Sequence, residues 1–243
     1  MSRLKKILLV NNVIWNETYP AQHPLKNVTA WYKKMLSPLK KFHLQTLSPE
    51  DQEIARHFEC ADAIILTGSP RNAWNNDYPT LRLLQLLERY TQKEKAILGI
   101  CYGHQLLARA CGGLVHYNPQ GWEIGFLPVT LTPQGKASPL FQSMPETFLA
   151  IESHHDIVAD LPPEAIWLAK SEQTRHQAFQ IGKAAFGVQF HPEMNRTILN
   201  FIWKARFDHW QAKIPFNIRD RIQKTPKTLP HPEMISNFIH YFT

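Results

Sequence analysis

Cys101 is the residue of this sequence best placed for covalent chemistry, because it lies between an apolar run and a helix-forming stretch. Gly99 and Gly103 flank it, two residues away on either side. A sharp strand-to-helix turn needs small residues at those places, since the backbones approach each other closely there. A thiol in such a turn also faces the positive end of the following helix, which favours the thiolate. The pattern predicts a cysteine nucleophile rather than a small core residue.

A thiol nucleophile needs a base that takes up and returns a proton, and the base needs a partner that fixes its tautomer. His191 and Glu193 offer this pair, with Pro192 between them, directly after the apolar run 184–190. Sites in open α/β sheets gather at the carboxyl ends of the strands. We therefore predict that folding brings Cys101, His191 and Glu193 together as a catalytic triad.

Other residues of the same types are not expected to act in catalysis. The tripeptide His-Pro-Glu occurs again at 231–233, but Pro230 precedes it, and proline is unfavourable in a central strand. We predict that this second copy lies in a loop. Cys60 and Cys111 are expected to be structural, and His104 is expected to be a hydrogen-bonded helix residue.

Attack on a carbonyl carbon places negative charge on its oxygen, which backbone N–H groups commonly stabilise. Tyr102 would be the first residue of the helix after Cys101, and its N–H is one predicted donor. The loop Gly68-Ser69-Pro70 follows another apolar run, at 62–67. Ser69 is the predicted second donor of this oxyanion hole, because proline has no N–H.

The segments that must position these residues alternate between apolar runs and helical patterns. This alternation predicts a parallel sheet with right-handed crossovers. The expected strands are 6–10, 42–47, 62–67, 96–100 and 184–190, and the expected helices are 28–36, 79–93 and 195–210. After Cys111-Gly112-Gly113, short strands without long helices between them predict antiparallel pairs; they are 114–117, 125–131, 147–151, 166–171 and 178–181.

The predicted fold is therefore an α/β three-layer sandwich, flavodoxin-like, with a mainly parallel central sheet and added antiparallel strands. We expect a single domain over residues 1–243, in which 211–243 form a C-terminal appendage that packs on it. The net charge of +7 comes from scattered Lys and Arg residues. Because these are not interleaved with stacking aromatics, nucleic acid is not an expected partner.

From the sequence we expect neither a targeting segment nor a metal-binding site. The apolar run 7–10 is too short for a signal peptide, and no stretch reaches the length of about 20 apolar residues that a membrane span needs. The three cysteines contain no C-x-x-C pair, so neither a disulfide framework nor structural zinc is expected. The spacing of His154, His155 and Asp156 fits no familiar zinc pattern. We expect a cytoplasmic protein without membrane, metal or other cofactor.

The segments G-I-C-Y-G-H-Q and G-V-Q-F-H-P-E, with the upstream G-S-P loop, resemble the class I glutamine amidotransferases. Within that family the chain is similar to stand-alone relatives of the GMP synthase amidotransferase domain. Segments 118–125 and 153–156 resemble those that border the family's glutamine pocket. The resemblance implies that Gln105 holds the amino-acid end of the substrate. It also implies a substrate pocket formed by Gly68, Trp122, Glu123, Ser153, His154 and His155, although Trp122 and Glu123 fit a packing role equally well.

The expected activity is hydrolysis of the γ-glutamyl amide of glutamine through a γ-glutamyl thioester, with release of glutamate and ammonia. The sequence ends at residue 243 without an ATP-binding domain, so the acceptor of ammonia is expected on a separate synthetase or acceptor-binding chain. Ser69 replaces a frequent family glycine, and His155 stands where GMP synthase relatives have glycine. Two alternatives stay open. One is a γ-glutamyl peptidase with a wide exit near Trp15, Trp74 or Trp122, and the other is a non-catalytic binding or regulatory module.

Overall fold

The computed structural model describes residues 4–13, 27–37, 42–211, 214, 217 and 232–242. Trp15, His231 and the proline before it lie outside the described residues. Within the described part, no helix combines the length and the apolar character that crossing a membrane requires.

A nine-stranded sheet forms the middle layer, in the order β2-β1-β3-β4-β11-β10-β9-β6-β7. The first five of these strands pair in parallel, as predicted. They are β2 (Phe42–Leu47), β1 (Lys5–Val10), β3 (Ala63–Leu66), β4 (Ala96–Ile100) and β11 (Ala185–Val188). Strands β3, β4 and β11 are buried along their whole length, which explains why the sequence shows them as continuous apolar runs.

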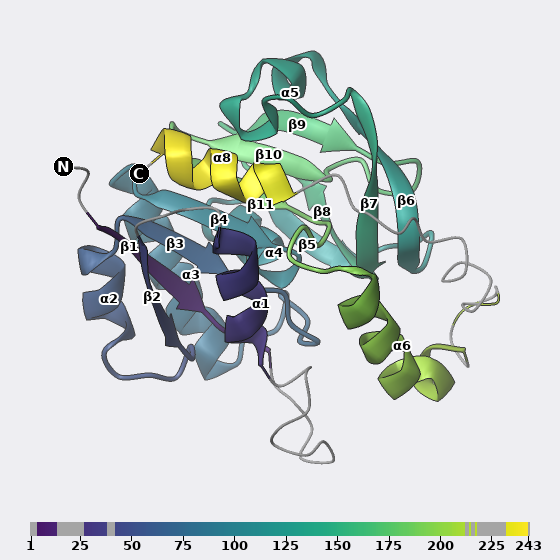
Figure 1. The fold of residues 1–243 in the computed structure, drawn as a ribbon, viewed down its shortest axis with the longest axis horizontal. Coiled ribbons are helices and arrows are strands. Elements are labelled where there is room, and N and C mark those ends of the chain that lie inside the picture. Colours follow the sequence, from purple (N-terminus) through teal and green to yellow (C-terminus); the bar gives the residue numbers. More distant parts are fainter. Residues whose placement is uncertain are drawn as a thin grey trace.

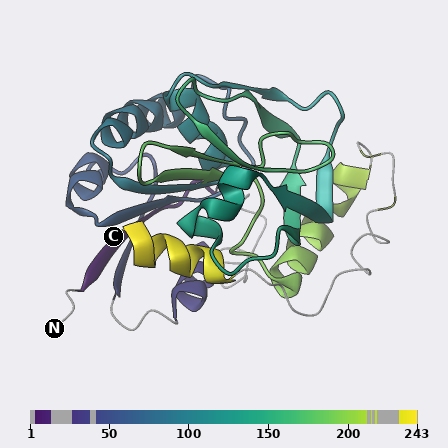
Figure 2. The ribbon, with the colours of Figure 1, turned by 90° about the horizontal axis from the view of Figure 1, so that it is seen from above.

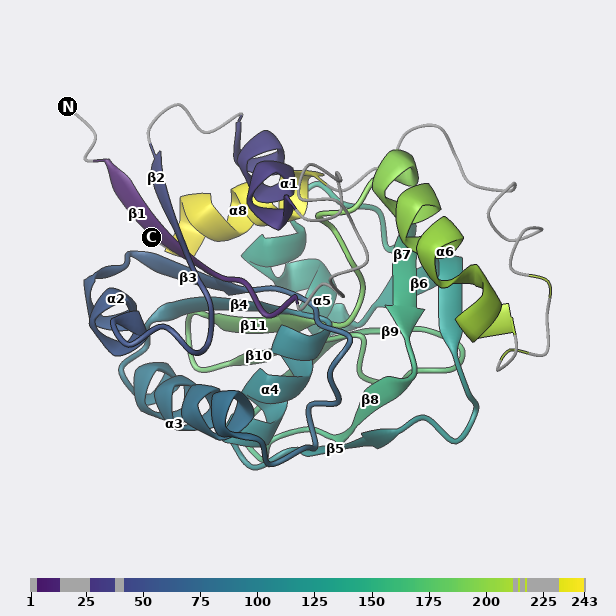
Figure 3. The ribbon, with the colours of Figure 1, turned by 90° about the horizontal axis from the view of Figure 1, so that it is seen from below.

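Helices cover both faces of this parallel part (Figures 1 and 3). Successive side chains of a strand point to opposite faces, so Leu9 packs in one core while Leu8 packs in the other. The first core contains α1 (Val28–Leu36) and α8 (Pro232–Phe242). The second contains α2 (Ile54–Cys60), α3 (Tyr78–Gln92) and α4 (Tyr102–Ala110). The arrangement is the predicted three-layer sandwich.

The antiparallel strands extend the sheet and form a small second one. The extension contains β6 (Glu123–Leu131), β7 (Thr147–His154), β9 (Ile166–Lys170) and β10 (Ala178–Ile181), and the small sheet pairs β5 (Leu114–Tyr117) with β8 (Asp156–Asp160). Two short helices, α5 (Pro133–Ala137) and η2 (Pro139–Phe141), follow β6. Helix α2, strand β8 and these short helices were not predicted from the sequence.

Two helices near the C-terminus pack at different places. Helix α6 (Arg196–Gln211) covers the β6–β7 end of the sheet, where Leu199 and Trp203 are buried against Ile151. Helix α8 contacts η2 and α1 and buries Phe238 in the first core, and Figure 2 shows it beside the α5–η2 segment. The predicted loop at 231–233 is wrong in its described part, because Pro232 and the exposed Glu233 begin α8. Proline suits the first turn of a helix, where its missing N–H is not needed.

Candidate active site

Cys101 occupies a strained turn between β4 and α4. Its backbone has φ of 50°, a left-handed conformation that is unusual for a residue with a side chain. The two glycines permit this turn by close contact. A Cβ on Gly99 would collide with the carbonyl group of Gly103, and a Cβ on Gly103 would lie 2.7 Å from the carbonyl oxygen of Leu66. The geometry is that of the predicted nucleophile elbow.

His191 reaches the same edge of the sheet from the neighbouring strand. Strands β4 and β11 pair in parallel, with Val188 opposite Ile100, so the residues that follow both strands emerge together. A Cβ built on Gly68 would lie 2.8 Å from Cε1 of His191 and 3.5 Å from Cβ of Cys101. The thiol, the imidazole and the loop after β3 therefore meet at one point, and Gly68 leaves room for the ring.

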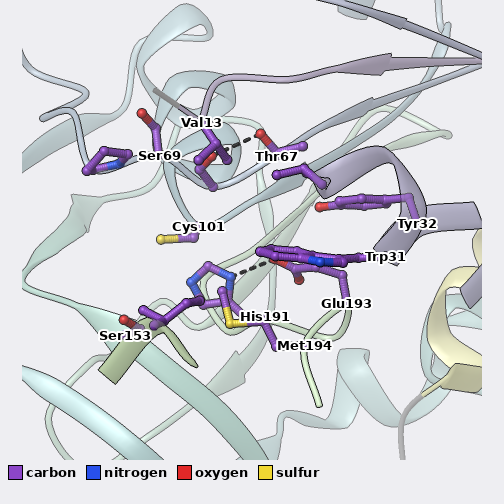
Figure 4. Close-up of a pocket in the computed structure, with 14 residues that line it drawn as sticks. Val13, Trp31, Tyr32, Thr67, Ser69, Cys101, Ser153, His191, Glu193 and Met194 are labelled. Atoms are coloured by element: carbon purple, nitrogen blue, oxygen red, sulfur yellow. Dashed lines mark hydrogen bonds and ion pairs between the residues drawn. The ribbon is translucent and has the colours of Figure 1, made fainter. Parts of the chain in front are cut away.

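Two hydrogen bonds hold His191, one through its backbone and one through its ring. Its backbone N–H donates to the carbonyl oxygen of Ile151 at 2.8 Å, and its ring Nδ1 lies 2.8 Å from Oε1 of Glu193. Both side chains are buried. Figure 4 shows the imidazole between Cys101 and the carboxylate, with the dashed line marking the bond to Glu193. Burial lowers the pKa of His191, but the negative charges of Glu193 and Cys101 outweigh it and raise the pKa well above its usual value.

Of the two predicted oxyanion donors, Tyr102 directly follows Cys101 in the chain and Ser69 lines the same pocket. Tyr102 is the first residue of α4, a position whose N–H has no partner inside the helix. Its ring packs in the second core, and its hydroxyl pairs with Oγ1 of Thr80 at 2.8 Å, so its backbone is the part available to a substrate. Ser69 lines the pocket beside Cys101, and its hydroxyl accepts a hydrogen bond from the N–H of Arg71 at 3.2 Å.

A pocket opens over the thiol, and it contains six of the site residues expected from the sequence. These are Gly68, Ser69, Cys101, Ser153, His191 and Glu193. The rest of the lining was not expected from the sequence; it is largely apolar and includes Val13, Val28, Trp31, Tyr32, Met194 and Ile202. Val28, Trp31 and Tyr32 follow each other at the i, i+3 and i+4 spacing of one helix face. This spacing is visible in the sequence, but it does not distinguish a pocket from the core.

Gln105 does not line this pocket, although the resemblance implied that it holds substrate. Its side-chain amide donates to the carbonyl oxygen of Asp156 at 2.8 Å and to Oε1 of Gln189 at 3.1 Å. The residue is buried. In this structure the side chain ties α4 to the start of β8.

Glu123 and His154 also lie outside the pocket lining, in a buried charged cluster with Glu152. Nε2 of His154 lies 3.2 Å from Oε2 of Glu123 and 3.1 Å from Oε2 of Glu152. Burial alone would lower the pKa of His154, but the two carboxylates raise it to about 10. Burial raises the pKa of Glu152 to about 7. The cluster fixes the end of β7, from which Ser153 enters the pocket.

His155, the residue after β7, packs against Trp122, the residue before β6. Their ring centroids are 4.4 Å apart, and Nδ1 of His155 lies 2.7 Å from Oδ1 of Asp156. Neither residue lines the pocket, and Trp74, another expected exit residue, is 46% exposed and also lies outside the lining. His104 lies in α4 and is buried against the ring of Phe179, but the expected hydrogen bond is wrong, since neither ring nitrogen has a partner among the described residues. Among the described residues, no group of His, Cys, Asp or Glu side chains is arranged to hold a metal ion.

Comparison with known sequences gives a consistent result. The family model for "glutamine amidotransferase class-I" matches residues 27–202. Gamma-glutamyl peptidase 5 of Arabidopsis thaliana is 32% identical over 153 residues, which are 62% of this chain and 59% of that protein. A glutamine-hydrolysing GMP synthase of Aeropyrum pernix is 35% identical over 179 residues, which are 74% of this chain and 31% of that protein. The matches thus span less than two thirds of each of these relatives.

Solved structures share the fold over almost the whole chain. A glutamine amidotransferase of Thermotoga maritima superposes with a TM-score of 0.78 and 23% sequence identity, covering 99% of both chains. At this identity the likeness concerns the fold.

Proposed function

The chain belongs to the class I glutamine amidotransferase family, and we propose that it hydrolyses a γ-glutamyl amide bond through a thioester on Cys101. One observation supports this proposal most strongly: the thiol of Cys101, on a strained turn, lies beside the buried imidazole of His191. Nδ1 of this imidazole lies 2.8 Å from Oε1 of Glu193. Nucleophile, base and orienting group are the three parts that such covalent catalysis needs.

In the first half of the reaction, the thiolate of Cys101 attacks the γ-carbonyl carbon. The negative charge moves to the carbonyl oxygen, where the N–H groups of Tyr102 and Ser69 stabilise it. The charged form of His191 gives its proton to the leaving nitrogen. The carbon–nitrogen bond then breaks, ammonia or an amine leaves, and the γ-glutamyl group stays on sulfur as a thioester.

In the second half, a water molecule attacks the thioester. His191, now neutral, takes a proton from this water, and the carbon–sulfur bond breaks to release glutamate and restore the thiolate–imidazolium pair. Glu193 orients the ring in both halves and stabilises its charged form. Water is consumed once, and the proton count balances.

Glutamine is the first proposed substrate, with the ammonia passed to an acceptor on a separate synthetase subunit. A γ-glutamyl peptide or conjugate is the second candidate, because the pocket beside Cys101 has an apolar wall that ammonia does not need. Without turnover, the chain would be a binding or regulatory module on the same fold.

The test is glutamate release by the purified chain from glutamine and from a set of γ-glutamyl amides. The wild type releases glutamate from at least one of them, and Cys101→Ala releases none. Equal rates for wild type and Cys101→Ala would reject the triad mechanism. The matched cysteine controls Cys60→Ala and Cys111→Ala are expected to keep the wild-type rate.

A further inference from the structure

The end of strand β7 holds the backbone of His191. The carbonyl oxygen of Ile151, in β7, accepts the backbone N–H of His191 at 2.8 Å. Strand β7 is the last strand in the order of the nine-stranded sheet, and β6 is its strand partner. The place of His191 beside Cys101 in the pocket (Figure 4) therefore depends on where this end of β7 lies.

The last residues of β7 alternate between the pocket side and a buried charged cluster. Successive side chains of a strand point to opposite faces. Ile151 packs with the residues of α6, and Ser153 lines the pocket. Glu152 and His154 alternate with them and are both buried. In the pairing of the two strands, His154 lies opposite Glu123, so the charged cluster of Glu123, Glu152 and His154 joins the end of β7 to the start of β6.

His154 is the centre of this charged cluster. Besides the two carboxylates, its ring contacts the start of β8, where Nδ1 lies 3.1 Å from the carbonyl oxygen of Asp156. Glu123 is held in turn by the segment after β9, because it accepts hydrogen bonds from the hydroxyl of Ser171 at 2.6 Å and from that of Thr174. The cluster thus links β7 to three other parts of the chain.

A contribution to stability does not by itself explain a buried cluster of this kind. The carboxyl group of Glu152 is fully buried and accepts no hydrogen bond among the described residues, although Nε2 of His154 lies 3.1 Å away. Burial of charge costs free energy, and apolar side chains of similar volume often give an equally stable protein. Polar networks do, however, make a structure rigid and specify one arrangement of it. Accurate placement is what a thiol and its base need.

We propose that the charged cluster positions His191 for catalysis, because it fixes the end of β7 and the carbonyl group of Ile151 passes this position on to the backbone of His191. The inference rests on the proposed function and adds three positioning residues to it. Cys101 is held independently, between β4 and α4. A shift of the β7 end therefore changes the distance between thiol and imidazole, and a misplacement of about 1 Å can lower a rate about a hundredfold.

The test uses a triple variant that removes the charges of the cluster and keeps most of its volume, Glu123→Gln with Glu152→Leu and His154→Leu. The amide at position 123 keeps an oxygen acceptor, and no buried charge is left, so the stability should stay close to that of the wild type. A urea titration checks this. His176→Leu is the matched control, since it removes another buried histidine, whose Nδ1 lies 2.9 Å from the carbonyl oxygen of Val158 in β8.

The first measurement is of kcat and KM for the γ-glutamyl amide that the wild type hydrolyses best. The triple variant should lower kcat about tenfold or more and change KM by a smaller factor, because the placement of the base affects the chemical steps most. His176→Leu should keep the wild-type kcat.

The second measurement is alkylation of Cys101 by iodoacetamide, followed by peptide mapping, at about pH 6.5 and about pH 9. The thiolate is the form that reacts, and the charged ring of His191 beside it favours this form. The rate at the lower pH divided by the rate at the higher pH should fall about fivefold or more in the triple variant. Access of the reagent to the pocket cancels from this ratio, and His176→Leu should leave the ratio unchanged.

The alkylation ratio needs no turnover, so the two proposals are tested separately. If the wild type hydrolyses no γ-glutamyl amide but the triple variant lowers the ratio, the proposed function fails and the positioning of His191 stands. A folded triple variant with the wild-type kcat or the wild-type ratio rejects the positioning role, and so does an equal loss in His176→Leu. If the triple variant does not fold, His154→Gln takes its place, since its amide fills much of the space of the ring without the charge.

Discussion

Oε1 of Glu193 lies 2.8 Å from Nδ1 of His191, although proline separates the two residues in the chain. The carboxylate raises the pKa of His191 and so favours the charged ring, whose Nδ1–H donates to Oε1 of Glu193. This bond fixes the ring so that its other nitrogen faces the thiol side of the pocket. The proposed mechanism depends on it.

Replacement of this carboxylate should lower turnover far more than binding. In triads of this kind an amide in place of the carboxylate favours the wrong tautomer and lowers kcat by about 10⁴-fold. We expect Glu193→Gln to lower kcat by about a hundredfold or more on this basis. Glu233→Gln is the matched control, since Glu233 belongs to the second His-Pro-Glu and is exposed on α8. Similar losses in both variants would contradict the assignment.

The elbow can be tested through the sign of a stability change. Alanine normally stabilises a helix relative to glycine by about 1 kcal/mol. At Gly103 the new Cβ would lie 2.7 Å from Cβ and from the carbonyl oxygen of Leu66. Gly103→Ala should therefore reduce the free energy of unfolding, by about 1–3 kcal/mol, as overpacking commonly does. A urea titration measures this, and a gain in stability would mean that helix and strand are less close than described.

His154 should be essential for stability because its charged ring pairs with the buried carboxylate of Glu123 and contacts the buried carboxyl group of Glu152. Removal of one partner from a buried ionic cluster costs about 3–5 kcal/mol, since it leaves uncompensated charge behind. We expect His154→Ala to lose this amount in thermal or urea unfolding. His116→Ala, at an exposed histidine of β5, should change stability little. A loss below 1 kcal/mol in His154→Ala would exclude a charged cluster.

Acid should destabilise the fold through His104. Burial lowers the pKa of His104 from its usual 6.5 to about 3. The unfolded chain therefore binds a proton below pH 6.5 that the folded chain does not, so the contribution of His104 is full above pH 6.5 and is lost as pH falls toward 3. The slope is at most about 1.4 kcal/mol per pH unit. Unfolding measured from pH 7 to 4 should show a smaller decline in His104→Asn, and an equal decline would reject this origin.

Apolar periodicity predicted the elements that build the parallel part. The predicted ranges of α1, β2 and β4 agree with the structure, because each has an apolar pattern bounded by polar residues or glycine. Strand β8 was missed because Asp156–Asp160 begins and ends with an acidic residue, which leaves an apolar run of only three residues between them. Helix α2 was missed because its seven residues show only two buried apolar positions.

The meeting of Cys101 and His191 was predictable because two parallel strands end at one sheet edge. The substrate-binding residues were less predictable. Gln105 bonds to Gln189, and His154 bonds to Glu123, and these partners lie far apart in the chain. Sequence spacing does not show that a polar side chain is already engaged inside the fold. Nor does an amphipathic pattern show that Trp31 of α1 faces a pocket rather than the core.

The central claim is that Cys101 carries the acyl group during turnover. Acid quenching of the purified chain during reaction with glutamine or with a hydrolysed γ-glutamyl amide, followed by intact-mass measurement and peptide mapping, tests it most directly. We predict one added γ-glutamyl group, located on the peptide that contains Cys101 and absent from Cys101→Ala. An acyl group on Cys60 or Cys111, or an adduct that persists in Cys101→Ala, would contradict the account.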